Sequence, residues 1–443
     1  MNPKPLAETL ATAALAGSLD VESLVGRWAE VFGKKRRWLR PLARRLVKRF
    51  GENSRPRRFQ VVRFIRDDDG FNNAAEGESS ASDGSPKARM CPAGKAARRW
   101  KVPRILTPGD LARWLDLPYE HLAWFADLRT LERLAPEGPL RHYRYRWLAK
   151  RDGTARLIEV PKPRLKAMQR RILAEILDRI PPHPAAHGFR AGHSIKTFVA
   201  PHIGQALVLR LDLRDFFPSI WKARVVAIFL TAGYPEPVAE LLAGLCTNTT
   251  PRPVLAAVPF KNAPAFRSAR LLYARPHLPQ GAPTSPALAN LAAWRLDRRL
   301  AGLTQSLAAN YTRYADDLVF SGDATFAKNA HRLAIHIGAI AIEEGFEVHW
   351  HKLRAMRRGV AQHAAGLTLN EHINIPRADF DRLKAILHNC AMHGPASQNR
   401  ANHPDFRAHI TGRLAHVEMV APDRARKLRA TFERIDWSAA QPM

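Results

Sequence analysis

The sequence predicts an α+β fold, with short strands and amphipathic helices in the same part of the chain. Two patterns predict strands: the apolar run from Leu207 to Leu213, and the strand, turn and strand from Tyr311 to Gly322. Apolar residues at helical spacing predict helices, as in the segment from Phe326 to Ala341, which Gly345 ends.

The charge balance points to a polyanionic partner. The 443 residues include 70 Lys and Arg against 40 Asp and Glu, a net charge of +30, and this length allows two or more domains. No apolar run approaches the roughly 20 residues of a membrane span, so we expect no membrane partner. Residues 1–25 do not resemble a secretory signal, and the three cysteines form no Cys-x-x-Cys pair. These features predict a cytoplasmic protein.

The N-terminal part predicts a basic helical extension over residues 1–66. Apolar residues recur at helical spacing from Lys34 to Phe50, with Arg and Lys around them. This helix is either an RNA-binding or partner-binding element, or a solvated basic face of an accessory bundle, and the sequence leaves both interpretations open. Residues 67–95 are rich in Asp, Gly, Ser, Asn and Ala, which is typical of a flexible linker.

The next segments predict a helical region, a hairpin and a long helix. The hairpin covers Tyr143 to Pro161, and its turn lies at Asp152-Gly153. Lys150 and Arg156 lie on this hairpin, where cations are able to hold a triphosphate; an ordinary basic hairpin is the alternative. A helix with apolar residues from Leu165 to Leu177 follows and stops before Pro181-Pro182.

Three carboxylates predict a metal site. Asp316 and Asp317 are adjacent in the turn of the predicted hairpin, and Asp212 lies in the apolar strand. Adjacent carboxylates repel each other, and a carboxylate in an apolar strand is costly unless it is paired or bound to a metal. Mg²⁺ prefers such oxygen ligands. The alternatives are a solvated turn for the pair and a salt-bridged or capping role for Asp212.

A rigid turn from Leu278 to Pro286 precedes a helix predicted over Ala287 to Leu300, with Thr284 or Ser285 as its cap. A strand is predicted from Phe346 to Trp350, with Lys352 just past it. The chain after residue 370 is expected to be helical.

Taken together, three motifs resemble the palm motifs of reverse transcriptases, and the fingers sequence and compact C-terminal part resemble the bacterial retron type. They read LDLRDFFPSI from Leu211, LPQGAPTSP from Leu278 and YADD from Tyr314. The resemblance covers roughly residues 96–437 and implies a right-hand polymerase fold. It places the fingers at 96–206, the palm at 207–370 and the thumb at 371–443.

The resemblance also implies roles for individual residues. Asp212, Asp316 and Asp317 match the catalytic metal-binding carboxylates, with the backbone carbonyl of Leu213 as a further ligand. Two Mg²⁺ ions, or Mn²⁺ in their place, would assist an in-line displacement. The positions matching nucleotide-binding residues are Arg156, Lys150, Phe217, Gln280 and Lys352, and those matching primer and template contacts are Gly366, Tyr314 and His202. Two motifs depart from the retron pattern: residues 198–202 read FVAPH and residues 364–366 read AAG.

The function implied is an RNA-directed DNA polymerase that copies a structured non-coding RNA into single-stranded, msDNA-like DNA from dNTPs. Antiviral defence with an effector protein is the expected setting, by family analogy alone. The alternatives are a group II intron-like or diversity-generating reverse transcriptase and a catalytically silent RNA-binding scaffold. An RNA-dependent RNA polymerase is disfavoured by Phe217, which matches the residue that rejects a ribose 2′-hydroxyl.

Overall fold

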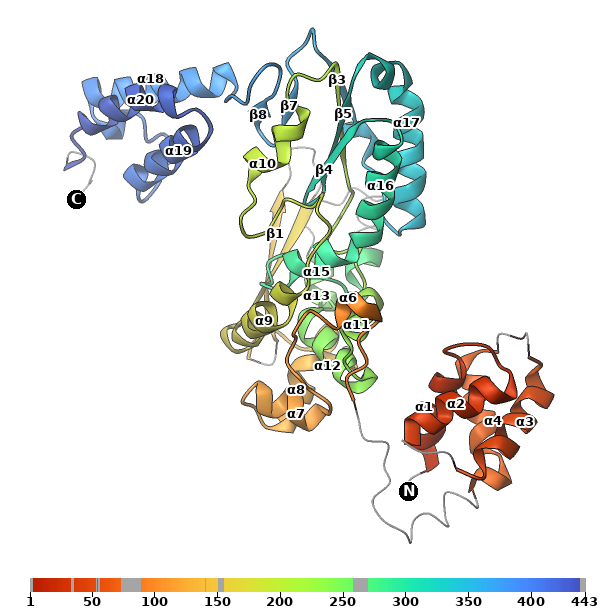
Figure 1. Cartoon of the computed structure of the whole chain (residues 1–443). Helices are drawn as coiled ribbons and strands as arrows, with labels where there is room; N and C mark the ends of the chain where they lie inside the picture. Colours follow the sequence, from red (N-terminus) through yellow and green to blue (C-terminus); the bar gives the residue numbers. More distant parts are fainter. Residues whose placement is uncertain are drawn as a thin grey trace. The chain divides into compact units, whose positions relative to one another are not determined.

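A computed structural model describes residues 3–32, 36–52, 54, 56–72, 89–139, 141–149, 155–257 and 270–438 (Figure 1). The chain divides into two compact units, residues 1–89 and 90–443. The division falls within the stretch 67–95.

The first unit is a set of helices around its own core. The helices are α1 (Pro3–Ala14), α2 (Val21–Phe32), α3 (Leu39–Phe50) and α4 (Arg58–Arg66). In α3, Leu39, Leu42 and Leu46 are fully buried at helical spacing, as expected. Phe71 is also fully buried in this core, so the unit continues beyond the expected boundary at residue 66.

The second unit begins earlier than the expected boundary at residue 96. The backbone N–H of Cys91 donates to the carbonyl of Gly233, at 2.8 Å, and that of Ala93 to the carbonyl of Thr231, at 2.9 Å. Both ends of the expected linker are therefore folded, while residues 73–88 lie outside the described ranges.

The N-terminal part of the second unit contains helices and one hairpin. The expected hairpin is present as the antiparallel strands β1 (Tyr143–Ala149) and β2 (Ala155–Pro161). The helices are α6 (Gly94–Ala97), α7 (Pro108–Trp114), α8 (Tyr119–Ala126), η1 (Leu131–Leu134), α9 (Pro163–Glu175), η2 (Leu177–Arg179), α10 (Ile195–Val199) and η3 (Ala200–His202). The helix expected to reach Leu177 ends at Glu175, and a 3₁₀ turn continues to the two prolines.

A four-stranded antiparallel sheet lies at the centre of the second unit. Its strand order is β4 (Asn310–Tyr314), β5 (Asp317–Gly322), β3 (Leu207–Asp212) and β6 (Arg354–Arg357). The expected hairpin and the expected strand from Leu207 are confirmed. The strand expected from Phe346 to Trp350 is wrong: only Val348 makes a bridge, to Leu213, and Trp350–Lys352 is a 3₁₀ turn, η4.

The sheet separates two hydrophobic cores because successive side chains of a strand point to opposite faces. Leu207, Leu209 and Leu211 pack into the larger core. Val208 packs on the other face, in the core that includes the C-terminal helices. Arg210 and Asp212 share the side of Val208 by the same alternation.

In the described residues 207–257 and 270–353, six helices accompany the sheet: α11 (Lys222–Ala232), α12 (Glu236–Cys246), α13 (Arg252–Ala256), α15 (Ser285–Ala292), α16 (Trp294–Gln305) and α17 (Ala324–Glu343). The single helix expected from Ala287 to Leu300 is two helices, separated at Ala293. The two pack on different neighbours, α15 on α11 and α16 on β4 and α17. Neither expected cap is observed: Thr284 makes no capping bond, and the Ser285 hydroxyl donates to the Pro279 carbonyl at 2.7 Å.

The C-terminal part is helical, as expected. A short hairpin, β7 (His363–Ala364) and β8 (Leu367–Thr368), leads into α18 (Arg377–His393), η5 (Pro395–Ser397), α19 (Phe406–Val420) and α20 (Pro422–Glu433). In the described part of the chain, no helix is long and apolar enough to cross a membrane.

Candidate active site

The fold brings the three predicted carboxylates together. Asp212 lies at the end of β3 directly opposite Asp317, the first residue of β5. Just beyond this pair, the N–H of Leu213 donates to the carbonyl of Asp316 at 2.9 Å, and the N–H of His349 donates to the carbonyl of Asp212 at 2.7 Å. Backbone hydrogen bonds therefore hold both carboxylate-bearing segments in register.

The turn that carries Asp316 is tightly constrained. Ala315 has a φ of 56°, a left-handed conformation that a residue with a side chain seldom adopts. Gly188 lies against this turn, and a Cβ at Gly188 would be 2.8 Å from the Ala315 nitrogen. Only glycine therefore allows this close approach.

A buried ion pair contacts the same turn through the Ala315 carbonyl. Arg313 and Asp297 are both fully buried, and the guanidinium donates to both carboxylate oxygens at 2.7 Å. Arg313 Nη1 also donates to Asn290 Oδ1 and to the Ala315 carbonyl, each at 3.0 Å. Burial opposes the charged guanidinium, but the Asp297 carboxylate outweighs this and raises the pKa of Arg313.

Basic side chains partner two of the three carboxylates. Arg210 donates to both oxygens of Asp317, at 2.9 and 2.8 Å, and Lys352 Nζ donates to Asp212 Oδ2 at 3.0 Å. Burial and then the neighbouring Asp212 carboxylate raise the pKa of Asp316 to about 6. Burial also raises the pKa of Asp317, and Arg210 opposes this shift. The charged form of Asp316 is therefore disfavoured in this site, and a bound cation would stabilise it.

The donor set fits a hard divalent cation in its chemistry, because carboxylate and carbonyl oxygens are the preferred ligands of Mg²⁺. Within the described ranges, however, no three His, Cys, Asp or Glu side chains are arranged to hold a metal ion. The contacts explain this, since Asp317 and Asp212 are turned toward Arg210 and Lys352. A metal ion at these carboxylates would compete with Arg210 and Lys352 for the same oxygens.

Of the expected nucleotide-binding residues, Lys352 contacts this site directly, and Lys150 falls outside the described residues. The exposed Arg156 on β2 acts on Asp316 electrostatically and lowers its pKa. Phe217 is half-buried and packs against the rings of Phe216 and Phe189. The carbonyl of Gln280 accepts a hydrogen bond from the Glu159 N–H at 2.9 Å.

The structure corrects the role expected for His202, because this side chain is fully buried and cannot touch primer or template directly. Its ring nitrogens each lie 2.7 Å from a hydroxyl, that of Ser321 on β5 and that of Thr312 on β4. The Thr312 hydroxyl donates to the Phe198 carbonyl, so His202 Nε2 donates to Thr312 and Nδ1 accepts from Ser321. His202 thus links the two strands of the β4–β5 hairpin through their side chains. Burial lowers the pKa of His202 to about 3.

The other two expected primer and template residues remain accessible. Tyr314 is half-buried at the end of β4, with its ring near Phe189 and Phe198. Gly366 is exposed in the turn between β7 and β8, with a φ of +76°. A hollow lies beside this turn, and its lining includes Gly366, Ile375, Asp379, His409, Arg413 and His416.

Sequence reasoning missed several supporting residues. Arg210 was detectable, because two-residue alternation places it on the same face of β3 as Asp212. The pairing of Arg313 with Asp297 and that of Glu159 with His277 left no local signal, since the partners come from separate elements.

Comparisons with known proteins identify the family. A family model described as reverse transcriptase (RNA-dependent DNA polymerase) matches residues 148–383. The Retron Mx65 reverse transcriptase of Myxococcus xanthus is 42% identical over 338 residues, which cover 74% of this chain and 72% of the relative. The Retron Mx162 enzyme of the same organism is 35% identical over 346 residues, 74% of this chain and 67% of the relative. The Retron Ec86 enzyme of Escherichia coli is 31% identical over 282 residues, which cover 63% of this chain and 77% of the relative. With this identity and coverage, and with the three carboxylates held at one end of the central sheet, the chain belongs to the retron reverse transcriptases, RNA-directed DNA polymerases with the fingers, palm and thumb fold.

Proposed function

We propose that this polymerase copies a structured non-coding RNA into single-stranded, msDNA-like DNA, and that Asp212, Asp316 and Asp317 direct the nucleotidyl transfer with two divalent cations. The relatives imply a non-coding RNA template and a DNA product. The observation that carries the catalytic assignment is the register of the sheet, which sets Asp212 opposite Asp317 and bonds the Asp316 backbone to Leu213.

Reverse transcriptases generally use divalent metal ions, and Mg²⁺, with Mn²⁺ as a substitute, suits this donor set. Asp212, Asp316, Asp317 and the Leu213 carbonyl would hold the ions. When bound, they lower the pKa of the primer 3′-hydroxyl and stabilise the charge on the nucleotide phosphates and the departing pyrophosphate.

The other residues around the site bind and orient the substrates. Arg156 neutralises charge on the triphosphate, and Gln280 contacts the nucleotide. Phe217 packs under the sugar of the incoming dNTP. In this role Phe217 would reject a ribose 2′-hydroxyl, as the matching residue of the family does, so that deoxynucleotides are selected. Lys352, already 3.0 Å from Asp212, is placed to give a proton to pyrophosphate. Gly366 and Tyr314 would lie beside the primer end.

The cellular setting is part of the proposal. The N-terminal unit carries the basic helix α3, with five Arg and Lys and no acidic residue, and this charge suits RNA. We assign to this unit a role in holding the RNA outside the polymerase fold. Antiviral defence together with an effector protein is the biological role we propose.

The test is to express the gene with several hundred flanking bases and to analyse the nucleic acid that co-purifies. We expect a discrete species sensitive to both RNase and DNase in the wild type, and no DNA in the Asp316→Asn, Asp317→Asn double variant. Asp323→Asn is the matched control, because Asp323 caps α17 after the same hairpin and Asn caps equally well.

Each other outcome has a definite meaning. Bound RNA without DNA in all three proteins would favour the catalytically silent scaffold. DNA of many sequences without a discrete RNA would favour a group II intron-like or diversity-generating enzyme. Ribonucleotides incorporated as readily as dNTPs would point to an RNA polymerase.

A further inference from the structure

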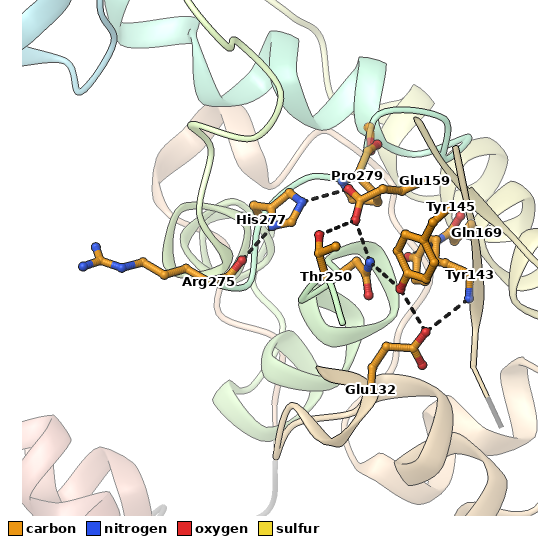
Figure 2. Close-up of polar contacts among 11 residues, drawn as sticks. Glu132, Tyr143, Tyr145, Glu159, Gln169, Thr250, Arg275, His277 and Pro279 are labelled. Carbon is orange, nitrogen blue, oxygen red and sulfur yellow. Dashed lines mark hydrogen bonds and ion pairs between the residues drawn. The ribbon is translucent and has the colours of Figure 1, made fainter. Parts of the chain in front are cut away.

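A fully buried carboxylate lies between the β1–β2 hairpin and the turn that carries Gln280. Figure 2 shows Glu159, on β2, at the centre of this network. Its oxygens accept hydrogen bonds from Asn248 Nδ2, Thr250 Oγ1 and His277 Nε2, each at 2.8 Å. Glu159 and His277 are both 0% exposed, so neither can exchange these bonds for water.

With Glu159 ionised, the hydrogen-bond partners of His277 require a donor at both ring nitrogens, which is the imidazolium form. Its Nε2 faces the Glu159 carboxylate, and its Nδ1 faces the Arg275 carbonyl at 2.7 Å. A carbonyl and a carboxylate only accept, so both ring nitrogens donate. Burial opposes this charge, but Glu159 outweighs it and raises the pKa of His277. The two residues form a buried ion pair, in which loss of one partner leaves an uncompensated charge.

Backbone hydrogen bonds fix Glu159 to the Gln280 turn and fix His277, which leads into that turn, to Asn248. The Glu159 N–H donates to the Gln280 carbonyl at 2.9 Å. Gly281 has a φ of +133°, and a Cβ there would be 2.8 Å from the Glu159 carbonyl, so turn and strand are in direct contact. The backbones of His277 and Asn248 exchange two hydrogen bonds, at 2.9 and 3.0 Å.

The network continues to the base of the hairpin. Asn248 Nδ2 also donates to the Tyr145 hydroxyl at 3.1 Å, and that hydroxyl donates to Glu132 Oε1 at 3.0 Å. Glu132 in turn accepts from the His142 N–H at 2.9 Å. The strand that carries Glu159 also carries Arg156, so these contacts hold the backbone of the strand from which Arg156 extends.

We propose that the Glu159–His277 pair is a positioning element that sets the Gln280 turn against the strand of Arg156, and thereby sets the affinity of the enzyme for the incoming dNTP. This inference rests on the proposed function, which assigns Arg156 and Gln280 to the nucleotide. Neither Glu159 nor His277 contacts the three carboxylates. The pair therefore acts on nucleotide binding, while the reacting groups stay in place.

The test compares His277→Leu with Glu159→Gln and with Val238→Ala in steady-state incorporation on a primed RNA template. His277→Leu leaves a buried unpaired carboxylate, so we expect the KM for dNTP to rise about 10- to 100-fold with kcat little changed. In Glu159→Gln the amide can still bond Asn248, Thr250 and a neutral His277. This variant should therefore keep most of the wild-type affinity for dNTP. Val238→Ala opens the fully buried core of α12 and reports lost stability alone.

A second variant decides the matter if His277→Leu does not fold. Gly281→Ala keeps the ion pair but forces the turn away from the Glu159 carbonyl, and it should raise the KM for dNTP in the same selective way. Hydrogen exchange adds a readout independent of polymerisation. In His277→Leu the Glu159 amide should exchange faster, while the Leu213 amide, bonded to Asp316, keeps its protection.

A KM that stays at the wild-type value in both His277→Leu and Gly281→Ala would overturn the proposal, as would equal changes of KM and kcat that match those of Val238→Ala. If the wild type incorporates no dNTP at all, the proposed function fails. The exchange experiment then still shows whether the pair holds the turn.

Discussion

Arg313 offers the sharpest test of how the fold supports the catalytic turn. We consider the change Arg313→Met, which fills similar space with an apolar side chain. The wild-type guanidinium is fully buried and makes four side-chain hydrogen bonds, two to Asp297, one to Asn290 and one to the Ala315 carbonyl. The variant therefore removes an ion pair and the support beneath Ala315 together.

The magnitude follows from burial. Asp297 is 0% exposed, and of its side-chain partners among the described residues it would keep only the Tyr311 hydroxyl, which donates to it at 2.8 Å. An uncompensated buried carboxylate of this kind costs about 3–5 kcal/mol of the free energy of unfolding. Without the bond to its carbonyl, Ala315 can leave its left-handed conformation and displace Asp316. A displacement of about 1 Å can lower the rate by about 100-fold.

A double variant separates stability from positioning. Arg313→Met with Asp297→Leu removes both charges, and replacing a buried pair by apolar residues is often neutral for stability. The Ala315 carbonyl still lacks its donor in this protein. We therefore expect the double variant to regain most of the stability and little of the activity. Urea unfolding and single-turnover incorporation of one dNTP measure the two quantities.

Arg429→Met is the matched control, because Arg429 pairs with Glu418 through two hydrogen bonds in the C-terminal helices with about a third of each side chain exposed. A partly exposed pair of this kind contributes about 1 kcal/mol or less. If Arg313→Met lowers the free energy of unfolding by no more than Arg429→Met does, the buried pair does not stabilise the fold. If the double variant regains both stability and rate, the turn does not depend on Arg313.

Three further predictions concern single side chains. Gly188→Ala should lower kcat by about 10- to 100-fold, because its Cβ would meet the Ala315 nitrogen at 2.8 Å. Gly302→Ala, in α16 with open space around it, should keep full activity in the same assay. His202 has a folded pKa of about 3 against an ordinary 6.5, so the unfolded chain binds more protons and stability falls as the pH drops below 6.5. From pH 7 to pH 5, urea unfolding of the wild type should lose about 2 kcal/mol more than that of His202→Gln, and an equal loss in both would argue that this histidine is not held neutral. Phe217→Ala should admit ribonucleotides, measured as the ratio of kcat/KM for rNTP and dNTP; an unchanged ratio would remove this residue from sugar selection.

Sequence reasoning predicted the features that depend on local pattern. An apolar run located β3, apolar residues on both sides of a turn located the β4–β5 hairpin, and helical periodicity located α9, α17 and the C-terminal helices. The three carboxylates were found because adjacent carboxylates repel each other and a carboxylate in an apolar strand is costly without a partner. The roles given to Phe217, Gln280 and Lys352 came from motif resemblance and stay predictions.

The errors occurred where the local pattern is weak or ambiguous. The edge strand β6 has the sequence RAMR and is mostly exposed, so it lacks the apolar alternation that marks a strand. The segment 346–350 has that alternation but forms one bridge only. The continuous helical periodicity around Ala293 concealed a break that depends on which elements the two helices meet.

The sequence by itself determined that this chain is a basic α+β protein with the motifs of a reverse transcriptase and three carboxylates suited to a divalent cation. Only the tertiary structure decided which side chains support them. Arg210 meets Asp317 across 107 positions, and Glu159 meets His277 across 118. Side chains so far apart become partners through strand register and helix packing, which are set by the whole core. The burial of His202 also depends on tertiary structure, because its partners Ser321 and Thr312 lie on β5 and β4, 119 and 110 positions away.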